Sequence, residues 1–480
     1  MELLIILPTN RSRQSKNPAE SDKGRSPRVS KGGKQSAEGS SSPAVETLLL
    51  TAWCRCQLAK FVFVQKTLPM FVQIKRYLQR YKSLSGNVLA LSLVSLLNDT
   101  SSDIIYPLLP AFLALTLGAS PFIIGLIEGF AESVAAFLKL FSGYLSDRFE
   151  KRKFPVFLGY SLASIARPLL AFVGSWQQVL FVRVTDRVGK GIRGAPRDAI
   201  IAASVPEEKR GLAFGFNRAA DHLGAVIGPI VAFILLSYFA ADTSNPTARE
   251  YQQVFLYASI PVVIGLFVIV FFVIESPKEV STKIEQPKIK LSLKEFDGNF
   301  KRLLIIVALF TLSNSTDAFL LLRAEQAGIP ITVLPLLWMG LHLSKVVSSL
   351  IFGDLSDRIG RKTLIFSGWI LYALVYAGFA FVSSAWQAWA LFLIYGIYFG
   401  LTEGAEKALV ADLVPKEKRG TAYGFYNLAF SITVFPASLI FGALWNMFDS
   451  PIVPFLVSAS ISVCAAILLL TVQTNLKSTV

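Results

Sequence analysis

Ionisable residues interrupt several apolar segments of this chain, and their spacing follows a helix. Asp99, Asp103 and Tyr106 stand at positions i, i+4 and i+7 of one segment, which places them on one helical face. Glu128 and Glu132 repeat the four-residue spacing in the next segment. An ionisable side chain costs about 2.5 to 3.5 kcal/mol at the centre of a bilayer, so it is expected to have a function there. The pattern predicts charge-based chemistry, namely binding of a polar solute and uptake of a proton by a carboxylate.

The fourth apolar segment, residues 179–201, carries the densest charge. It has five basic residues and two acidic ones: Arg183, Arg187, Lys190, Arg193 and Arg197, with Asp186 and Asp198. We expect this basic set to face Glu128 and Glu132, because unpaired charges in lipid would be prohibitive. The second half of the chain is mostly acidic at the corresponding places: Asp317, Arg323 and Glu325, then Glu403, Glu406, Lys407 and Asp412.

Two interpretations of these residues are open. In one, they line a central cavity, bind a polar or charged solute and let a carboxylate take up the coupling proton. In the other, most form fixed salt bridges that hold helices together. His222 could carry protons near neutral pH or be a packed polar residue. The candidates for solute and proton binding are Asp99, Asp103, Tyr106, Glu128, Glu132, Arg187, Arg193, Arg197, Asp221, His222, Asp317, Arg323, Glu403 and Lys407.

The composition indicates which elements position these residues. Hydrophobic residues make up 53% of the 480 residues and charged ones only 16%, with a mean hydropathy of +0.53. Apolar segments of about 20 residues, long enough to span a bilayer as helices, recur about twelve times from Asn87 onward. The sequence therefore predicts an all-α integral membrane protein.

The net charge of +15 comes mainly from the N-terminal tail. Residues 1–86 hold 15 Lys/Arg and 5 Asp/Glu, so they contribute 15 − 5 = +10. Their Ser, Gly, Lys and Arg content cannot form a packed core, and no nucleic-acid partner is expected. Either synthesis begins at Met70, before a short basic helix, or residues 1–69 are a disordered cytoplasmic tail. The three cysteines, Cys54, Cys56 and Cys464, predict neither a disulfide framework nor a metal site.

The chain contains an internal repeat. VPEEKRGLAFGF at Val205 returns as VPKEKRGTAYGF at Val414, and three further features recur in the same order at similar spacing: GYLSDRFEKRK and GDLSDRIGRK, AFVGSWQ and AFVSSAWQ, SSD and STD. Internal duplication is common in transporter folds. The repeat predicts six spans per half, and it assigns the charged segment 179–201 as a span because its counterpart, residues 390–410, is apolar.

These observations predict four regions: the tail at 1–86, a six-helix bundle at 87–275, a central loop at 276–299 and a second bundle at 300–477. Lys and Arg gather in the connections after even-numbered spans. By the positive-inside rule, both termini and the central loop are expected to be cytoplasmic. We expect a monomeric multi-pass protein of the cytoplasmic (inner) membrane, whose partners are the lipid bilayer, a small-molecule substrate and protons or ions.

The paired G-x-L-S-D-R-x-G-R-K segments, which follow the second span of each half, resemble the signature loop of the major facilitator superfamily of secondary transporters. The likeness covers residues 87–477 and is greatest to bacterial and archaeal members without an assigned substrate. It implies twelve transmembrane helices in two pseudo-symmetric six-helix bundles, around a cavity that opens alternately to either side. It also implies a latch between the bundles, formed by Gly143, Asp147, Arg148, Gly353, Asp357, Arg358, Gly360 and Arg361. Glu150 departs from this pattern, since the family usually has Gly there.

Glycines at helical spacing predict close helix contacts. Gly224, Gly228 and Pro229 resemble the antiporter motif of drug exporters in this superfamily, although its trailing glycines are absent; the alternative is a packing seam with a proline kink. Gly396, Gly400 and Gly404 form a second seam. Two further small-residue faces are expected after the repeated loops, at Gly211 and Gly215 and at Gly420 and Gly424.

The function expected from these features is proton-coupled efflux of a small polar, charged or drug-like solute. The alternatives are a solute importer and a receptor or scaffold with the same fold but no transport. An enzyme is not expected, because the chain has no G-x-S-x-G or H-E-x-x-H motif and no complete phosphate-binding loop. No cofactor is expected either.

Overall fold

The computed structural model describes residues 84–148, 152–275, 293–415 and 418–473. The N-terminal tail and the hypothesised start at Met70 lie outside these residues. All regular structure in the described ranges is helical, as the composition predicts. The domain boundaries expected at both ends of the central loop remain predictions.

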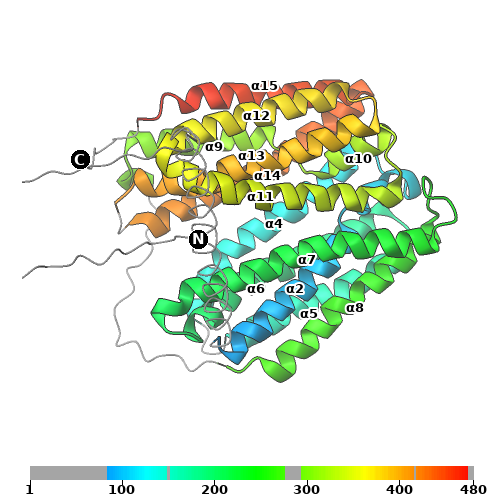
Figure 1. Cartoon of the computed structure of the whole chain (residues 1–480), viewed down its shortest axis with the longest axis horizontal. Coiled ribbons are helices and arrows are strands. Elements are labelled where there is room, and N and C mark those ends of the chain that lie inside the picture. Colours follow the sequence, from blue (N-terminus) through cyan, green and yellow to red (C-terminus); the bar gives the residue numbers. More distant parts are fainter. Residues whose placement is uncertain (1–83, 149–151, 276–292, 416–417, 474–480) are drawn as a thin grey trace, which may run out of the picture. The chain divides into compact units, whose positions relative to one another are not determined.

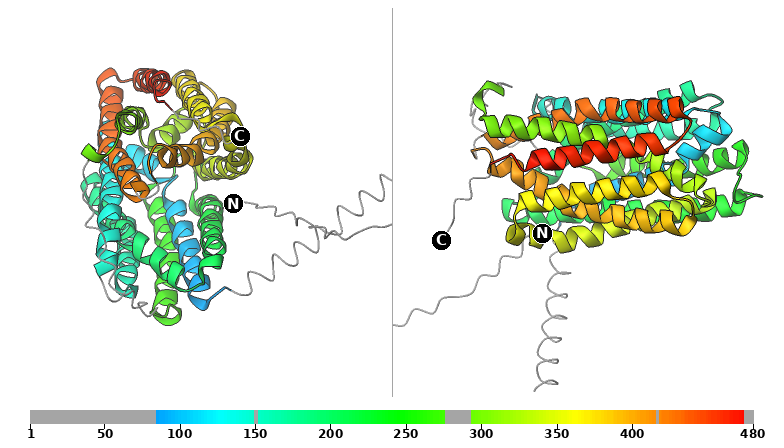
Figure 2. Two further views of the ribbon diagram at one scale, coloured as in Figure 1. Left: turned by 90° about the vertical axis from the view of Figure 1, so that its left-hand side faces the viewer. Right: turned by 90° about the horizontal axis from the view of Figure 1, so that it is seen from above.

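The first half contains six long helices (Figure 1): α2 (Gly86–Ile105), α4 (Pro121–Arg148), α5 (Lys153–Leu169), α6 (Trp176–Ala203), α7 (Arg210–Phe239) and α8 (Ala248–Phe272). The second half repeats them with α9 (Gly298–Ser313), α11 (Leu334–Ile359), α12 (Arg361–Phe381), α13 (Ala385–Asp412), α14 (Arg419–Phe448) and α15 (Ile452–Leu469). Seen along the helices, the two halves form separate groups (Figure 2, left). The predicted twelve-helix architecture is confirmed.

Helix α6 is the span that hydropathy does not find. Eleven helices of the described chain are long and apolar enough to cross a membrane, and α6 is the long helix missing from that set. Its charges are tolerated because its neighbours α4 and α5 supply partners for them. The helix that the repeat counterpart predicts for this segment is therefore confirmed.

The first and seventh spans are interrupted beside equivalent carboxylates. After Asp103, α2 ends at Ile105 and a turn leads into the short α3 (Leu109–Ala111). In the second half, α9 ends at Ser313 and the helix resumes as α10 (Ala318–Gln326) directly after Asp317. Backbone groups freed inside a membrane need other partners. The Tyr372 hydroxyl donates to the Ser313 carbonyl at 2.7 Å, so part of this need is met by side chains.

Glycines allow close approach at two seams. A Cβ on Gly224 or Gly228 of α7 would come within 2.6 Å of a backbone carbonyl of α2. On α13, a Cβ on Gly396 or Gly400 would come within about 2.5 Å of the serines that α11 presents. The packing-seam interpretation therefore holds for Gly224 and Gly228 on α7 and for Gly396 and Gly400 on α13.

Other glycines were expected to pack closely and do not. A Cβ at Gly404 would meet nothing within 4 Å, so the α13 seam ends at Gly400. The same open space surrounds Gly211, Gly215, Gly420 and Gly424. These four follow the repeated loops at the start of α7 and α14. The small-residue faces predicted there are wrong for this conformation.

The two halves contact each other mainly along two helix pairs, α4 with α14 and α7 with α11. The contact is tight toward the end that carries the connections after odd-numbered spans. There, a Cβ on Gly442 of α14 would come within 2.5 Å of the Pro121 carbonyl. At the same end, the Thr332 backbone N–H donates to the Thr243 carbonyl of the other half at 3.3 Å. The halves are thus joined at this end.

Candidate functional site: a charged cavity between the two halves

A cavity of about 490 Å³ lies between the halves, and both contribute to its wall. Ionisable side chains dominate the lining. The first half supplies Asp99, Asp103, Tyr106, Glu132, Arg187, Lys190, Arg218, Asp221 and His222, and the second half supplies Asp317, His342, Lys345 and Glu403. Nine of the fourteen candidate residues predicted from the sequence line this cavity. The remaining five are Glu128, Arg193, Arg197, Arg323 and Lys407.

Asp103 connects the halves at the cavity wall. The indole N–H of Trp338 on α11 donates to Asp103 Oδ1 at 3.0 Å. The Nε2 atom of His342, one helical turn further, lies 3.9 Å from the same oxygen. The Trp338 ring also packs on Tyr106, the residue that follows α2, with ring centroids 4.8 Å apart. A carboxylate of the first half is therefore contacted by side chains of the second.

Asp317 occupies the equivalent place in the second half, but its partner comes from its own half. The buried hydroxyl of Tyr395 on α13 donates to Asp317 Oδ1 at 2.9 Å. Tyr395 belongs to an aromatic cluster in which it stacks on Tyr398, with centroids 5.6 Å apart. A second cavity of about 210 Å³ shares Tyr106, Glu132 and Asp317 with the first. The two carboxylates thus have neutral hydrogen-bond donors.

Lys345 on α11 is a cation that we did not predict as a site residue. Its ammonium lies 3.6 Å from the centre of the Phe399 ring, a cation–π contact. A signal for it was present, because it is a lone lysine in the apolar segment LHLSKVVSSL. Trp338 had no comparable signal, since a tryptophan in a membrane span is ordinary packing material.

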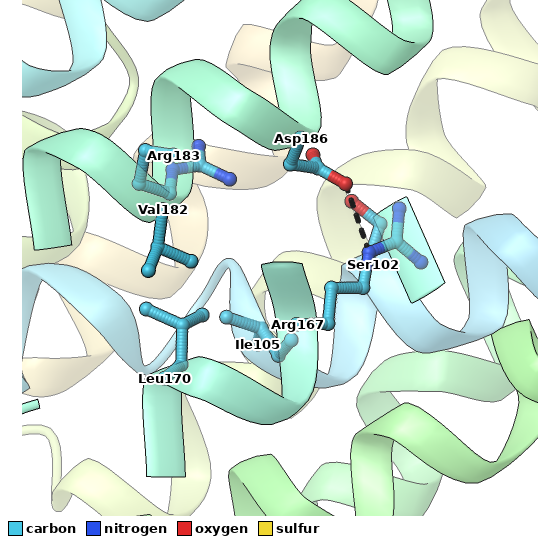
Figure 3. Close-up of a pocket in the computed structure, with 7 residues that line it drawn as sticks. All are labelled: Ser102, Ile105, Arg167, Leu170, Val182, Arg183 and Asp186. Atoms are coloured by element: carbon cyan, nitrogen blue, oxygen red, sulfur yellow. Dashed lines mark hydrogen bonds and ion pairs between the residues drawn. The ribbon is translucent and has the colours of Figure 1, made fainter. Parts of the chain in front are cut away.

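The charged residues behind the cavity form closed ion pairs, one of which is drawn in Figure 3. Arg167 reaches from α5 to the Asp186 carboxylate on α6, with Nε 3.1 Å from Oδ1. Arg183 makes a two-pronged contact with Glu128 of α4, at 2.8 and 2.6 Å. All four side chains are buried. The salt-bridge interpretation therefore applies to Glu128, which does not line the main cavity. Arg167 was not predicted from the sequence, because its role depends on its contact with a neighbouring helix.

The remaining four candidates also have structural partners. Arg193 lies over the Tyr160 ring at 4.4 Å, and Arg197 donates to Ser95 at 2.9 Å. Arg323 binds backbone carbonyls at the end of α12, including that of Val382 at 2.6 Å. Lys407 pairs with Glu403, one helical turn away, at 3.3 Å. These four side chains do not line the main cavity, because their helical positions turn them to other helices or away from it.

Comparison with known proteins decides the family. The family model for the Major Facilitator Superfamily matches residues 91–438 and, in a second match, residues 324–479. The chain belongs to the major facilitator superfamily. It is accordingly a secondary transporter and a multi-pass membrane protein, and its family is not one of enzymes.

Several members of the superfamily are similar along most of the chain. An uncharacterized MFS-type transporter of Methanocaldococcus jannaschii is 35% identical over 397 residues, covering 81% of this chain and 95% of the relative. The multi-drug resistance efflux pump PmrA of Streptococcus pneumoniae is 24% identical, covering 70% of this chain and 83% of the pump. The similarity thus extends over most of each relative's length.

Solved structures of the superfamily share the fold. The nucleoside transporter NupG matches with a TM-score of 0.66 at 14% identity, covering 80% of this chain and 98% of that one. A bacterial homologue of the lysosomal transporter Spinster, in an inward-facing and occupied conformation, matches with a TM-score of 0.65 at 15% identity, covering 80% and 95%. At this identity the likeness concerns the fold alone.

The superfamily's signature loops lie at the ends of α4 and α11. Gly143, Asp147 and Arg148 are in the last turns of α4, and Gly353, Asp357 and Arg358 in those of α11, but their side chains lie outside the described part of the structure. Gly360 has a φ of 96°, which favours glycine, and separates α11 from α12. Arg361 forms an ion pair with Asp412 of its own half. The latch between the bundles remains a prediction.

Proposed function

We propose that this superfamily member exports a small polar or charged solute in exchange for protons, and that Asp103 carries the proton. The observation that supports the proposal is the cavity between the halves, whose wall contains a carboxylate of one half bound by a neutral donor of the other. Such a carboxylate can gain or lose a proton without leaving a lysine or arginine unpaired.

The hydrogen bond between Asp103 and Trp338 couples protonation of Asp103 to the contact between the two halves. A hydrogen bond to an ionised acceptor is roughly twice as strong as one between neutral groups. Protonation of Asp103 therefore weakens a contact between the halves on the side where they are joined. Proton binding would favour separation of the halves at that end, and proton release would favour the conformation described here.

We also propose an orientation in the membrane, from the distribution of Lys and Arg. Lys209, Arg210, Lys362 and Arg419 lie in or beside connections after even-numbered spans, at the end opposite the Thr243–Thr332 contact. Applied to them, the positive-inside rule makes both termini and the central loop cytoplasmic in an inner membrane. The described conformation would then be closed to the outside, and the protein would act as a monomer.

Proteoliposomes with an imposed pH gradient and an internal pH-sensitive dye test this function. We expect some solute of a broad metabolite panel to move against the proton flux, and to lose this coupling in Asp103→Asn. Solute and proton movement in the same direction would indicate an importer. If no solute moves under any gradient while the protein remains folded, the transporter is not proton-coupled and the proposal is wrong.

A further inference from the structure

Most of the charged side chains that line the cavity do not form ion pairs with each other. Six carboxylates and four Lys or Arg side chains face it. Only Glu132 and Arg187 form a direct ion pair between lining residues, at 2.8 Å, among the side chains that the structure describes. Apart from this pair, the Lys, Arg and carboxylate side chains that line the cavity do not form salt bridges with each other, in contrast to the paired residues behind the wall.

Four of the six carboxylates that line the cavity accept a hydrogen bond from a neutral donor. Besides Asp103 and Asp317, Asp99 accepts a hydrogen bond from the Asn98 amide at 2.9 Å, and Asp221 accepts one from the Asn217 amide at 3.1 Å. Asp99, Asp103 and Asp317 thus keep their positions through bonds that leave them without an ion pair to Lys or Arg among the described side chains. Asp221 differs, because Arg197 approaches it to 3.9 Å. The charges of the other three are available to a bound solute.

Two of the four Lys and Arg side chains that line the cavity are equally available. Lys190 of α6 and Arg218 of α7 make no ion pair or hydrogen bond with any described residue, and both line the cavity. Two buried polar atoms of the lining, Arg187 Nε and His342 Nε2, also lack a hydrogen-bond partner there. Buried polar groups in native proteins are usually satisfied, so unpaired ones call for an occupant.

We propose that the transported solute is a small zwitterion that bridges the halves. Its anionic group would bind Lys190 and Arg218 of the first half, and its cationic group would bind Asp317 of the second. An anion alone would satisfy the free cations and leave the carboxylates uncompensated, and a cation alone would do the reverse. This inference rests on the proposed transport function and names the substrate class for the same site.

The size and walls of the cavity suit such a solute. A volume of about 490 Å³ falls in the usual range of about 300 to 1,000 Å³ for small-molecule sites. The paired rings of Tyr106 and Trp338 provide an apolar surface beside the charges. A solute of the size of an amino acid or dipeptide, with a modest apolar part, meets these conditions.

Thermal unfolding of the purified full-length protein tests the inference. The panel contains amino acids, dipeptides, aminosulfonates and betaines, and each amino acid or dipeptide is compared with its methyl ester, a cation, and its N-acetyl form, an anion. We expect at least one zwitterion to raise the unfolding midpoint, and its blocked forms to bind at least tenfold more weakly. The inference would be overturned if a blocked form stabilised the protein as much as its zwitterion does. It would also be overturned if no zwitterion of the panel raised the unfolding midpoint.

Variants of the cavity identify the two binding groups. Lys190→Gln and Asp317→Asn should each weaken binding of the zwitterion at least tenfold, and Lys190→Arg should restore it in part. Arg249→Gln and Asp242→Asn change the same charges at exposed positions outside the cavity and should leave binding unchanged. If both cavity variants bound the zwitterion as tightly as the wild type does, the inference would also be contradicted.

The transport assay separates this inference from the function on which it rests. If a solute with a single charge moves in exchange for protons and zwitterions do not, the transporter stands and the substrate class is wrong. If no solute of either kind moves, the transport proposal itself fails.

Discussion

The contact between Trp338 and Asp103 makes a quantitative prediction about the conformational equilibrium. Trp338→Phe keeps an aromatic ring but removes the indole N–H that lies 3.0 Å from Asp103 Oδ1. A hydrogen bond to a charged group contributes about 1.5 to 3 kcal/mol. Since the bond joins the halves only while they are closed at this end, its loss should shift the equilibrium toward the open state. At about 1.36 kcal/mol per factor of ten, the shift is about tenfold to 150-fold.

Distance measurements between spin labels report this equilibrium. One label at Asp242 and one at Gln326, both exposed near the joined end of the halves, should show a short distance in the wild type. In Trp338→Phe, a second and longer distance should become populated. Cys54, Cys56 and Cys464 must be replaced first, so that only the introduced cysteines are labelled.

Two comparisons isolate the hydrogen bond from the smaller size of phenylalanine. Trp386→Phe makes the same change on the exposed side of α13 and should leave the distances unchanged. In an Asp103→Asn background, Trp338→Phe should shift the equilibrium less than it does alone, because the charged acceptor is already absent. An unchanged distance distribution in Trp338→Phe, or the same shift with and without Asp103, would refute the reasoning.

Three further substitutions have defined outcomes. Asp103→Asn should remove the dependence of transport on the pH gradient while the unfolding midpoint stays within a few degrees of the wild type; gradient-driven transport in this variant would exclude Asp103. Glu128→Gln should leave Arg183 as a buried uncompensated charge and destabilise the fold by about 3 to 5 kcal/mol, measured as chemical unfolding in detergent; an unchanged midpoint would show that water replaces the partner. Gly228→Ala should lower the thermal midpoint, since its Cβ would meet a backbone carbonyl, whereas Gly404→Ala should not; equal effects would mean that the α2–α7 seam is loosely packed.

The architecture was predictable from the sequence because the repeat compensates for weak signals. Hydropathy alone finds eleven spans and misses α6, whose charge is too high. Its apolar counterpart α13 corrected this. The repeat also matched Asp103 with Asp317, which the structure places beside equivalent helix breaks. A duplicated sequence therefore carried information that neither half carried alone.

The division of charges between cavity and packing could not be predicted in the same way. Arg187 and Lys190 line the cavity, whereas Arg183 and Arg193 on the same helix are buried against neighbours. This difference depends on how α6 is rotated, which hydropathy does not determine. Trp338 was missed for a related reason: its importance comes from a contact with a residue 235 positions earlier in the chain.

The central claim is that the cavity is open to water from alternate sides of the membrane. A cysteine at Ser102, which lines the cavity, tests it most directly in a cysteine-free background and in vesicles of known orientation. A charged thiol reagent should modify Ser102→Cys from the cytoplasmic side in the otherwise wild-type protein, and increasingly from the opposite side when Trp338→Phe is added. No modification from either side in both backgrounds would mean that the charged residues enclose no solute path, and would contradict the account.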